Sequence, residues 1–153
     1  MDEDSIKRYI FDSFQSVDHV ESEGNYFFFY NPDSPPDHMF PFVTLMTNDI
    51  NDNASNLNRP DVYRLNIGVS RETYQSLFGP QPPPPDATGI VGAGHDFTVL
   101  DQLMPHPVYA PQSWLCVLNP GPATFETVKD LLSEAYQRAV DRRNKRAVVG
   151  KAE

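Results

Sequence analysis

Residues 100–140 constrain the fold of this chain more than any other segment. They hold an apolar run at 114–118, an Asn-Pro-Gly-Pro turn, and a long stretch with apolar residues at helical spacing. Because the run at 114–118 is apolar at every position, it predicts a central strand that is covered on both faces. The stretch after it predicts a helix, capped by Thr124, with an apolar stripe wide enough to cover a sheet. We therefore expect a sheet with a long helix packed against it.

The first part of the chain adds a helix and a hairpin. Acidic residues precede apolar residues at helical spacing over 4–14, which predicts a helix capped by Asp2 or Asp4. Residues 17–30 place turn residues between two strand-like runs, the second of which is the aromatic run YFFFY. Strand side chains alternate between two faces, so these aromatic residues cannot all point the same way. We expect either a strand covered on both faces or an aromatic set that lines a groove or a subunit contact.

Two further strands and a short helix are expected in the middle of the chain. Residues 42–47 are apolar, and 62–69 alternate between apolar and polar residues, which predicts one buried face and one face in water. Ser70 is placed to cap a helix over 71–78, and Gly79 to end it. This order predicts an α+β fold. We expect a two-layer sandwich of the order α-β(3)-α-β(2)-α, an antiparallel sheet of about five strands with its helices on one face.

Two polar segments interrupt this pattern. Residues 48–58 are rich in Asn and Asp and look like a calcium loop, but Ala54 stands where such a loop needs glycine, and Pro60 where it needs glutamate. We therefore expect an exposed polar loop. Residues 79–96 combine a proline run with a glycine-rich stretch that fails the spacing of a phosphate-binding loop. They predict a mobile loop.

The composition is that of an acidic globular domain. The chain has 153 residues, of which 39% are hydrophobic, and a formal net charge of −9. That charge disfavours nucleic acid and anionic membranes, and no apolar run is long enough to span a membrane. The single cysteine, Cys116, excludes an internal disulfide and fits a reducing compartment. We expect a cytoplasmic protein with one domain over residues 1–143 and a basic, disordered tail over 144–153.

Three features carry a family resemblance: the pattern RLNIGVSRETYQSLFG, the residues His106 and Tyr109 ahead of a strand that opens with Trp114, and the helical pair Ala135-Tyr136. With the order of the elements, they resemble the MmcQ/YjbR-like proteins, closest to an actinomycete-type bacterial branch of unknown function. The resemblance covers most of the chain. It implies a CyaY-like two-layer fold and, for the broader family, a DNA-binding role. It implies no catalytic residues.

Two binding functions are open at this point. The first is a non-catalytic module whose partner is an unknown small ligand, a protein or a second copy of the chain. Its site would use aromatic and histidine side chains, namely Tyr26, Phe28, Tyr30, His106, Tyr109 and Trp114. The second is a DNA-binding accessory protein. It would use basic side chains, namely Arg64, Arg71, Arg142 and Arg143.

A metal-dependent enzyme is the third and least favoured function. It would rest on the loop histidines His38, His95 and His106, none of which has the helical spacing of a known metal motif. Cys116 lies inside an apolar strand, so we expect a buried thiol with a raised pKa and no nucleophilic role. No serine stands in the nucleophile motif of hydrolases. The sequence therefore predicts no catalytic residue, no metal site and no cofactor.

Overall fold

The computed structural model describes residues 2–32, 40–92 and 94–152. The elements, in chain order, are α1 (Glu3–Ser13), β1 (Val17–Ser22), β2 (Asn25–Tyr30), β3 (Val43–Met46), β4 (Arg64–Gly68), α2 (Arg71–Phe78), β5 (Met104–Pro105), the 3-10 turn η1 (Ala110–Gln112), β6 (Trp114–Leu118) and α3 (Pro122–Ala152). All strand pairs in the described sheet are antiparallel, in the order β1-β2-β3-β4-β6-β5.

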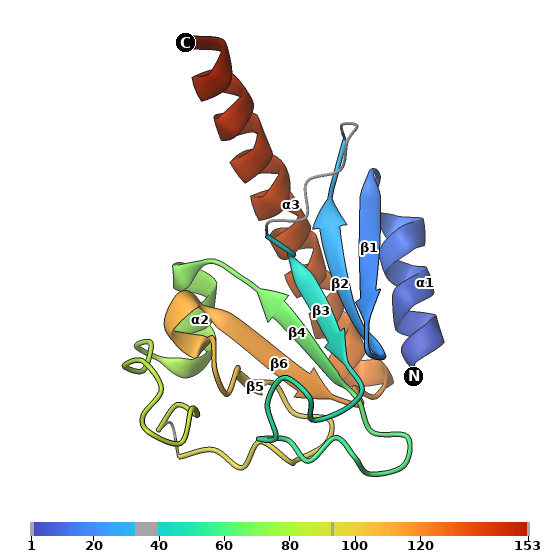
Figure 1. Ribbon diagram of the computed structural model, residues 1–153, viewed down its shortest axis with the longest axis vertical. Coiled ribbons are helices and arrows are strands. Elements are labelled where there is room, and N and C mark those ends of the chain that lie inside the picture. The colour runs from blue at the N-terminus through green and yellow to red at the C-terminus, as the bar shows by residue number, and fades with distance from the viewer. Residues whose placement is uncertain (1, 33–39, 93, 153) are drawn as a thin grey trace.

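The predicted α+β fold is confirmed. Three helices pack against an open antiparallel sheet of six strands (Figure 1). The sheet has one strand more than expected, because four strands rather than three precede α2. None of the described helices is long and apolar enough to cross a membrane.

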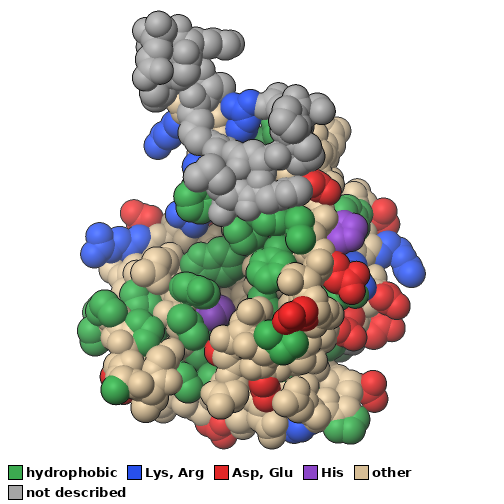
Figure 2. Space-filling model, in the orientation of Figure 1, with side chains coloured by type: hydrophobic (Ala, Val, Ile, Leu, Met, Phe, Trp, Pro, Cys, Tyr) green, Lys and Arg blue, Asp and Glu red, His purple; other side chains and the backbone are tan. Residues whose placement is uncertain are grey.

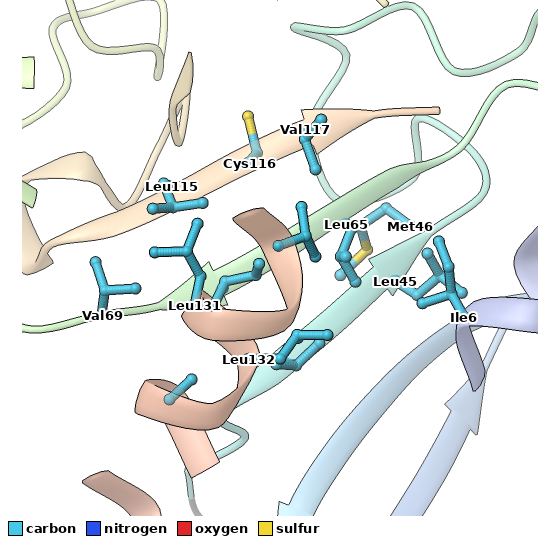
Figure 3. Packing of buried hydrophobic residues seen from close by; sticks show 14 of the residues in the cluster. Ile6, Leu45, Met46, Leu65, Val69, Leu115, Cys116, Val117, Leu131 and Leu132 are labelled. Atoms are coloured by element: carbon cyan, nitrogen blue, oxygen red, sulfur yellow. The ribbon is translucent and has the colours of Figure 1, made fainter. Parts of the chain in front are cut away.

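The core lies between one face of the sheet and the helices α1 and α3. Side chains from four adjacent strands meet there as cross-strand partners, and all are fully buried: Phe28, Val43, Ile67 and Leu115. Strand side chains alternate, so the next residue along β6 points to the opposite face. Figure 3 shows this alternation, with Leu115 and Cys116 pointing to opposite sides of the strand. The expectation that β6 is covered on both faces is confirmed, since Cys116 is as buried as its neighbours.

Local sequence signals set the hairpin and the ends of two helices as predicted. Glu23 and Gly24 both have positive φ, 53° and 84°, which is the backbone of a tight hairpin turn. The carboxylate of Asp2 accepts the Ser5 N–H at 2.8 Å and caps α1. Ser70 caps α2 in the same way. These caps and the turn need only residues that are close in sequence, which is why the sequence reveals them.

The cap predicted for α3 is wrong, because the helix begins at Pro122 rather than after Thr124. Proline suits this first helical position, since its missing N–H would have no partner there. The N–H of the preceding residue, Gly121, donates instead to the carboxylate of Asp101 at 2.7 Å. Asp101 lies in the loop before β5, so no local pattern identifies it.

Two segments expected at the surface are in fact packed. The loop over 48–58 buries Ser55 and Leu57, and it folds over the sheet face that is turned away from the helices. The alternation predicts that the polar residues of β4 face water. That prediction is wrong, because Arg64 and Asn66 are buried. In the Pro- and Gly-rich segment, Val91 is buried and its N–H donates to the carbonyl of Pro107 at 2.8 Å.

Helix α3 crosses the predicted boundary between residues 143 and 144 and continues to Ala152. The predicted division of the chain into a domain and a tail remains a prediction. Of the proline-rich segment over 31–41, residues 33–39 lie outside the described residues, and His38 is among them.

Candidate ligand pocket on the open face of the sheet

A pocket of about 490 Å³ opens on the sheet face opposite α1 and α3. Its floor includes polar side chains of β3 and β4, namely Thr44, Arg64 and Asn66. Its walls are mostly apolar and aromatic: Phe27, Phe40, Pro41, Met46, Tyr109 and Trp114. Asn51, Asp52 and His106 complete the described lining. Figure 2 shows hydrophobic side chains gathered around a hollow on this face. A concave apolar site with a few fixed polar groups is the usual form of a small-molecule pocket.

The centre of the floor is the buried ion pair of Arg64 and Asp52. The guanidinium holds the carboxylate with two parallel bonds, Nη1 to Oδ1 at 2.9 Å and Nη2 to Oδ2 at 2.7 Å. Arg64 is only 1% exposed. Burial disfavours the charge on Arg64, but the hydrogen bonds and charge of Asp52 outweigh it and raise the pKa of the guanidinium. Burial likewise opposes the charge on Asp52, yet Arg64 lowers its pKa below the ordinary value. Both groups are therefore ionised.

A chain of hydrogen bonds extends from this pair across the floor. The Nε of Arg64 donates to Asn66 Oδ1 at 2.9 Å, and Asn66 Nδ2 donates to Thr44 Oγ1 at 2.9 Å. Arg64 Nη1 also donates to the hydroxyl of Ser55 at 3.0 Å. A polar network in a buried site is stabilising when its members are bonded to one another, and it then fixes their rotamers. The floor of the pocket is therefore rigid before any ligand arrives.

His106 has a defined tautomer. Its Nδ1 accepts the backbone N–H groups of Val108 and Tyr109, both at 3.0 Å. A nitrogen that accepts hydrogen bonds carries no proton, so the proton of the neutral ring is on Nε2. Burial and the nearby positive charge of Arg64 hold the pKa of His106 well below its usual range, and Asp52 only partly opposes them. In the described part of the chain, the Nε2–H of this pocket-lining ring has no acceptor.

The buried, neutral state of His106 predicts acid lability. The unfolded chain binds a proton on this ring below about pH 6.5, whereas the folded chain does so only at much lower pH. Stability is therefore fully present above that pH and falls as the pH drops. In His106→Asn, the amide oxygen can take the place of Nδ1 and cannot be protonated. We expect the free energy of unfolding of the wild type to fall by about 1 kcal/mol more than that of the variant between pH 6.5 and 5.5. Urea titrations at both pH values measure this, and parallel losses would contradict it.

Trp114 forms one wall because β4 has a glycine opposite it. Gly68 is the cross-strand partner of Trp114. A Cβ on Gly68 would lie 2.8 Å from the Cε2 and 2.9 Å from the Cζ2 of the indole. Real Cβ atoms do not approach other atoms so closely, so the indole can lie over β4 only because residue 68 has no side chain. This glycine is therefore part of the shape of the pocket.

The residues predicted to bind a ligand fall on opposite faces of the sheet. His106, Tyr109 and Trp114 line the pocket together, with the His106 ring 5.1 Å from that of Tyr109 and 6.5 Å from that of Trp114 between centroids.

Tyr26, Phe28 and Tyr30 lie on the helix side. Phe28 is fully buried against α1, the Nζ of Lys7 lies 4.0 Å from the Tyr26 ring, and Tyr30 packs against Tyr136 of α3. Phe27, from the same strand, reaches the pocket instead. The two predicted sets therefore do not form one site.

The basic residues predicted for DNA binding also lie apart. Arg64 is buried in its ion pair, so it cannot reach a phosphate at the surface. Arg71 is exposed at the start of α2. Arg142 and Arg143 are on α3, where the Arg142 guanidinium lies 5.6 Å from the centre of the Phe40 ring.

Neither the cysteine nor the described histidines form a reactive cluster. Cys116 is buried as predicted, its thiol 3.6 Å from the carbonyl oxygen of Pro105, and burial raises its pKa to about 12. His95 is exposed and does not line the pocket. Within the described ranges, no three His, Cys, Asp or Glu side chains are grouped so that they could hold a metal ion.

Sequence reasoning missed Asp52, Asn66 and Thr44 as parts of the site. One signal was available, because Arg64 and Asn66 interrupt a strand that is otherwise apolar. A buried arginine needs an acid, and Asp52 lies in the Asn- and Asp-rich segment just before that strand.

Comparisons with known proteins give a family but no activity. A family model described as "Family of unknown function (DUF6194)" matches residues 1–148. No curated protein and no solved structure matches the chain.

Proposed function

Because the chain belongs to DUF6194, a family of unknown function, its role has to be inferred from its own residues, and we propose that it is a non-catalytic domain that binds a small organic molecule in the open-face pocket. The observation that carries this proposal is an aromatic-walled pocket built over a floor of buried, mutually bonded polar groups. Burying charged and polar groups costs free energy of folding, and apolar residues of similar volume would stabilise a purely structural core at least as well.

The rim of the pocket supports the same conclusion. Tyr109 is 54% exposed and Phe40 is 55% exposed, and both line the opening. Large aromatic side chains left in water at the edge of a hollow mark binding sites more often than isolated surface residues do. A ligand that covers them would remove apolar surface from water, which is favourable by about 25 cal/mol per Å². Since the floor is already fixed, little free energy is lost in arranging it.

The ionisable groups of the pocket favour binding over catalysis. Asp52 is held in its ion pair, and His106 is kept neutral by its surroundings. A general acid or base works best when its pKa lies near the operating pH. Neither group meets this condition near neutral pH.

We also propose that this family lies within the MmcQ/YjbR-like superfamily with a CyaY-like fold. An antiparallel sheet flanked by an N-terminal and a C-terminal helix supports it. A bacterial, cytoplasmic protein remains part of the proposal, in keeping with the lone cysteine. In the DNA-binding alternative, Arg71, Arg142 and Arg143 remain candidate phosphate contacts, whereas Arg64 is buried in its ion pair. No described contact favours this alternative over the pocket.

Trp114 provides the test of binding, because it is the single tryptophan of the chain and lines the pocket. We expect small aromatic fragments to change its fluorescence in a saturable way. Tyr109→Ala should weaken such fragments by about two- to tenfold, since an aromatic pair contributes about 0.5–1.5 kcal/mol. The exposed Leu77 on α2 offers a matched control, and Leu77→Ala should leave the affinities unchanged. Fragments that bind equally well to both variants and the wild type would contradict the proposal.

A further inference from the structure

We propose that the ligand of this pocket is an uncharged aromatic molecule whose carbonyl-type acceptor takes the Nε2–H of His106. This inference rests on the proposed function and specifies the chemistry of its ligand. It follows from the unused donor, from the balance of charge and from the walls of the pocket.

The donor is fixed by the backbone. The segment after β5 wraps around the ring, so the N–H groups of Val108 and Tyr109 both point at Nδ1. The N–H of His106 itself donates to the carbonyl of Trp114 at 3.0 Å, which ties the segment to β6. The ring is therefore held with Nδ1 on the loop and Nε2–H without an acceptor among the described residues. Among the described residues Glu134 Oε2 alone is a fully buried side-chain polar atom without a partner, so water in the pocket can still reach the Nε2–H, and an acceptor on a ligand would take the place of that water.

The charges of the described pocket residues balance one another without a ligand. Of the described residues that line the pocket, Arg64 and Asp52 alone carry formal charges, and these are paired with each other. An anion would have to compete with Asp52 for the guanidinium, and a cation would have to compete with Arg64 for the carboxylate. Either one would be taken out of water with no free counter-charge among the described residues of the lining, which is costly. A neutral molecule avoids this cost.

The walls select the shape of the ligand. Phe27, Tyr109 and Trp114 present rings to the pocket, and the last two lie beside the His106 ring. Aromatic rings pack well on one another in stacked or edge-to-face arrangements. The donor and the rings are adjacent, so the acceptor belongs on or next to an aromatic ring, as in an aryl amide.

Four probes of similar shape separate these requirements: benzamide is neutral with a carbonyl, toluene is neutral without one, benzoate is an anion and benzylamine is a cation. Affinities are read from Trp114 fluorescence. We expect benzamide to bind best, toluene several-fold more weakly, and both charged probes at least about tenfold more weakly. Tighter binding of benzoate or benzylamine than of benzamide would overturn this ligand class and leave a binding pocket in place. Failure of all four probes to bind would count against the proposed function itself.

Two variants of His106 separate its role as a donor to the ligand from its role in holding the loop through Nδ1. In His106→Asn, the amide oxygen replaces Nδ1 toward the loop, but no N–H reaches the position of Nε2. In His106→Gln, the amide N–H can reach that position. We expect Asn to weaken benzamide about threefold to tenfold and to leave toluene unchanged, and Gln to recover part of the benzamide affinity. Equal losses for benzamide and toluene in the Asn variant would mean that His106 only shapes the site, which overturns its role as donor.

Discussion

Replacing Asp52 by alanine should destabilise the protein by about 3–5 kcal/mol, because it leaves a buried guanidinium without its counter-charge. Arg64 is 1% exposed and donates two of its hydrogen bonds to this carboxylate. These bonds also tie the loop over 48–58 to β4. The effect is measured as the change in the free energy of unfolding in urea, and we expect the loop to lose its protection from proteolysis at the same time.

Two further variants show whether the cost comes from burial of the charge. Removing both charges together, as in Asp52→Leu with Arg64→Met, should restore most of the lost stability, since a buried pair can be replaced by apolar side chains of similar volume. Glu126→Ala breaks a surface ion pair with Lys129 and should leave the unfolding curve nearly unchanged. A loss from Asp52→Ala no larger than that from Glu126→Ala would contradict the assigned role of the pair.

Gly68→Ala should have the second largest effect. The new methyl group would lie within 3 Å of the Trp114 indole, at 2.8 Å from Cε2. Overpacking of this kind costs about 1–3 kcal/mol. The indole can move only by turning away from β4, so it would enter or reshape the pocket. We therefore expect a lower midpoint in urea, a changed Trp114 emission spectrum and a loss of fragment affinity of about tenfold or more.

The control for this variant is Gly92→Ala, because a Cβ at Gly92 would meet nothing within 4 Å. That change should alter neither the stability nor the emission spectrum. If Gly68→Ala kept the stability and the spectrum of the wild type, the indole would not lie over β4 as described.

The parts of the fold that the sequence reveals are those set by neighbouring residues. The turn at Glu23 and Gly24, the cap at Ser70 and the apolar run of β6 each depend on a few adjacent positions. The α+β class follows from their order. The same reasoning places His106, Tyr109 and Trp114 near one another, since they lie within nine positions in the chain and close onto β5 and β6.

The rest depends on contacts between distant residues, and no local pattern specifies those. The alternation in β4 predicts a face in water, but every residue of β4 is buried, and the loop over 48–58 supplies Asp52 as the partner of Arg64. The run YFFFY is apolar at every position, so its sequence does not say which rings face the helices. The pairing of β2 with β3 decides this and sends Phe28 to the core and Phe27 to the pocket.

The most direct test of the pocket is a map of backbone and indole N–H shifts in NMR spectra while benzamide is added to the protein. If the open face of the sheet is the binding site, the largest shifts will fall on Asn66, His106, Tyr109 and the indole of Trp114. Shifts that gather instead in the groove between α1 and α3, around Tyr9 and Phe125, would place the ligand on the wrong face and contradict the proposal.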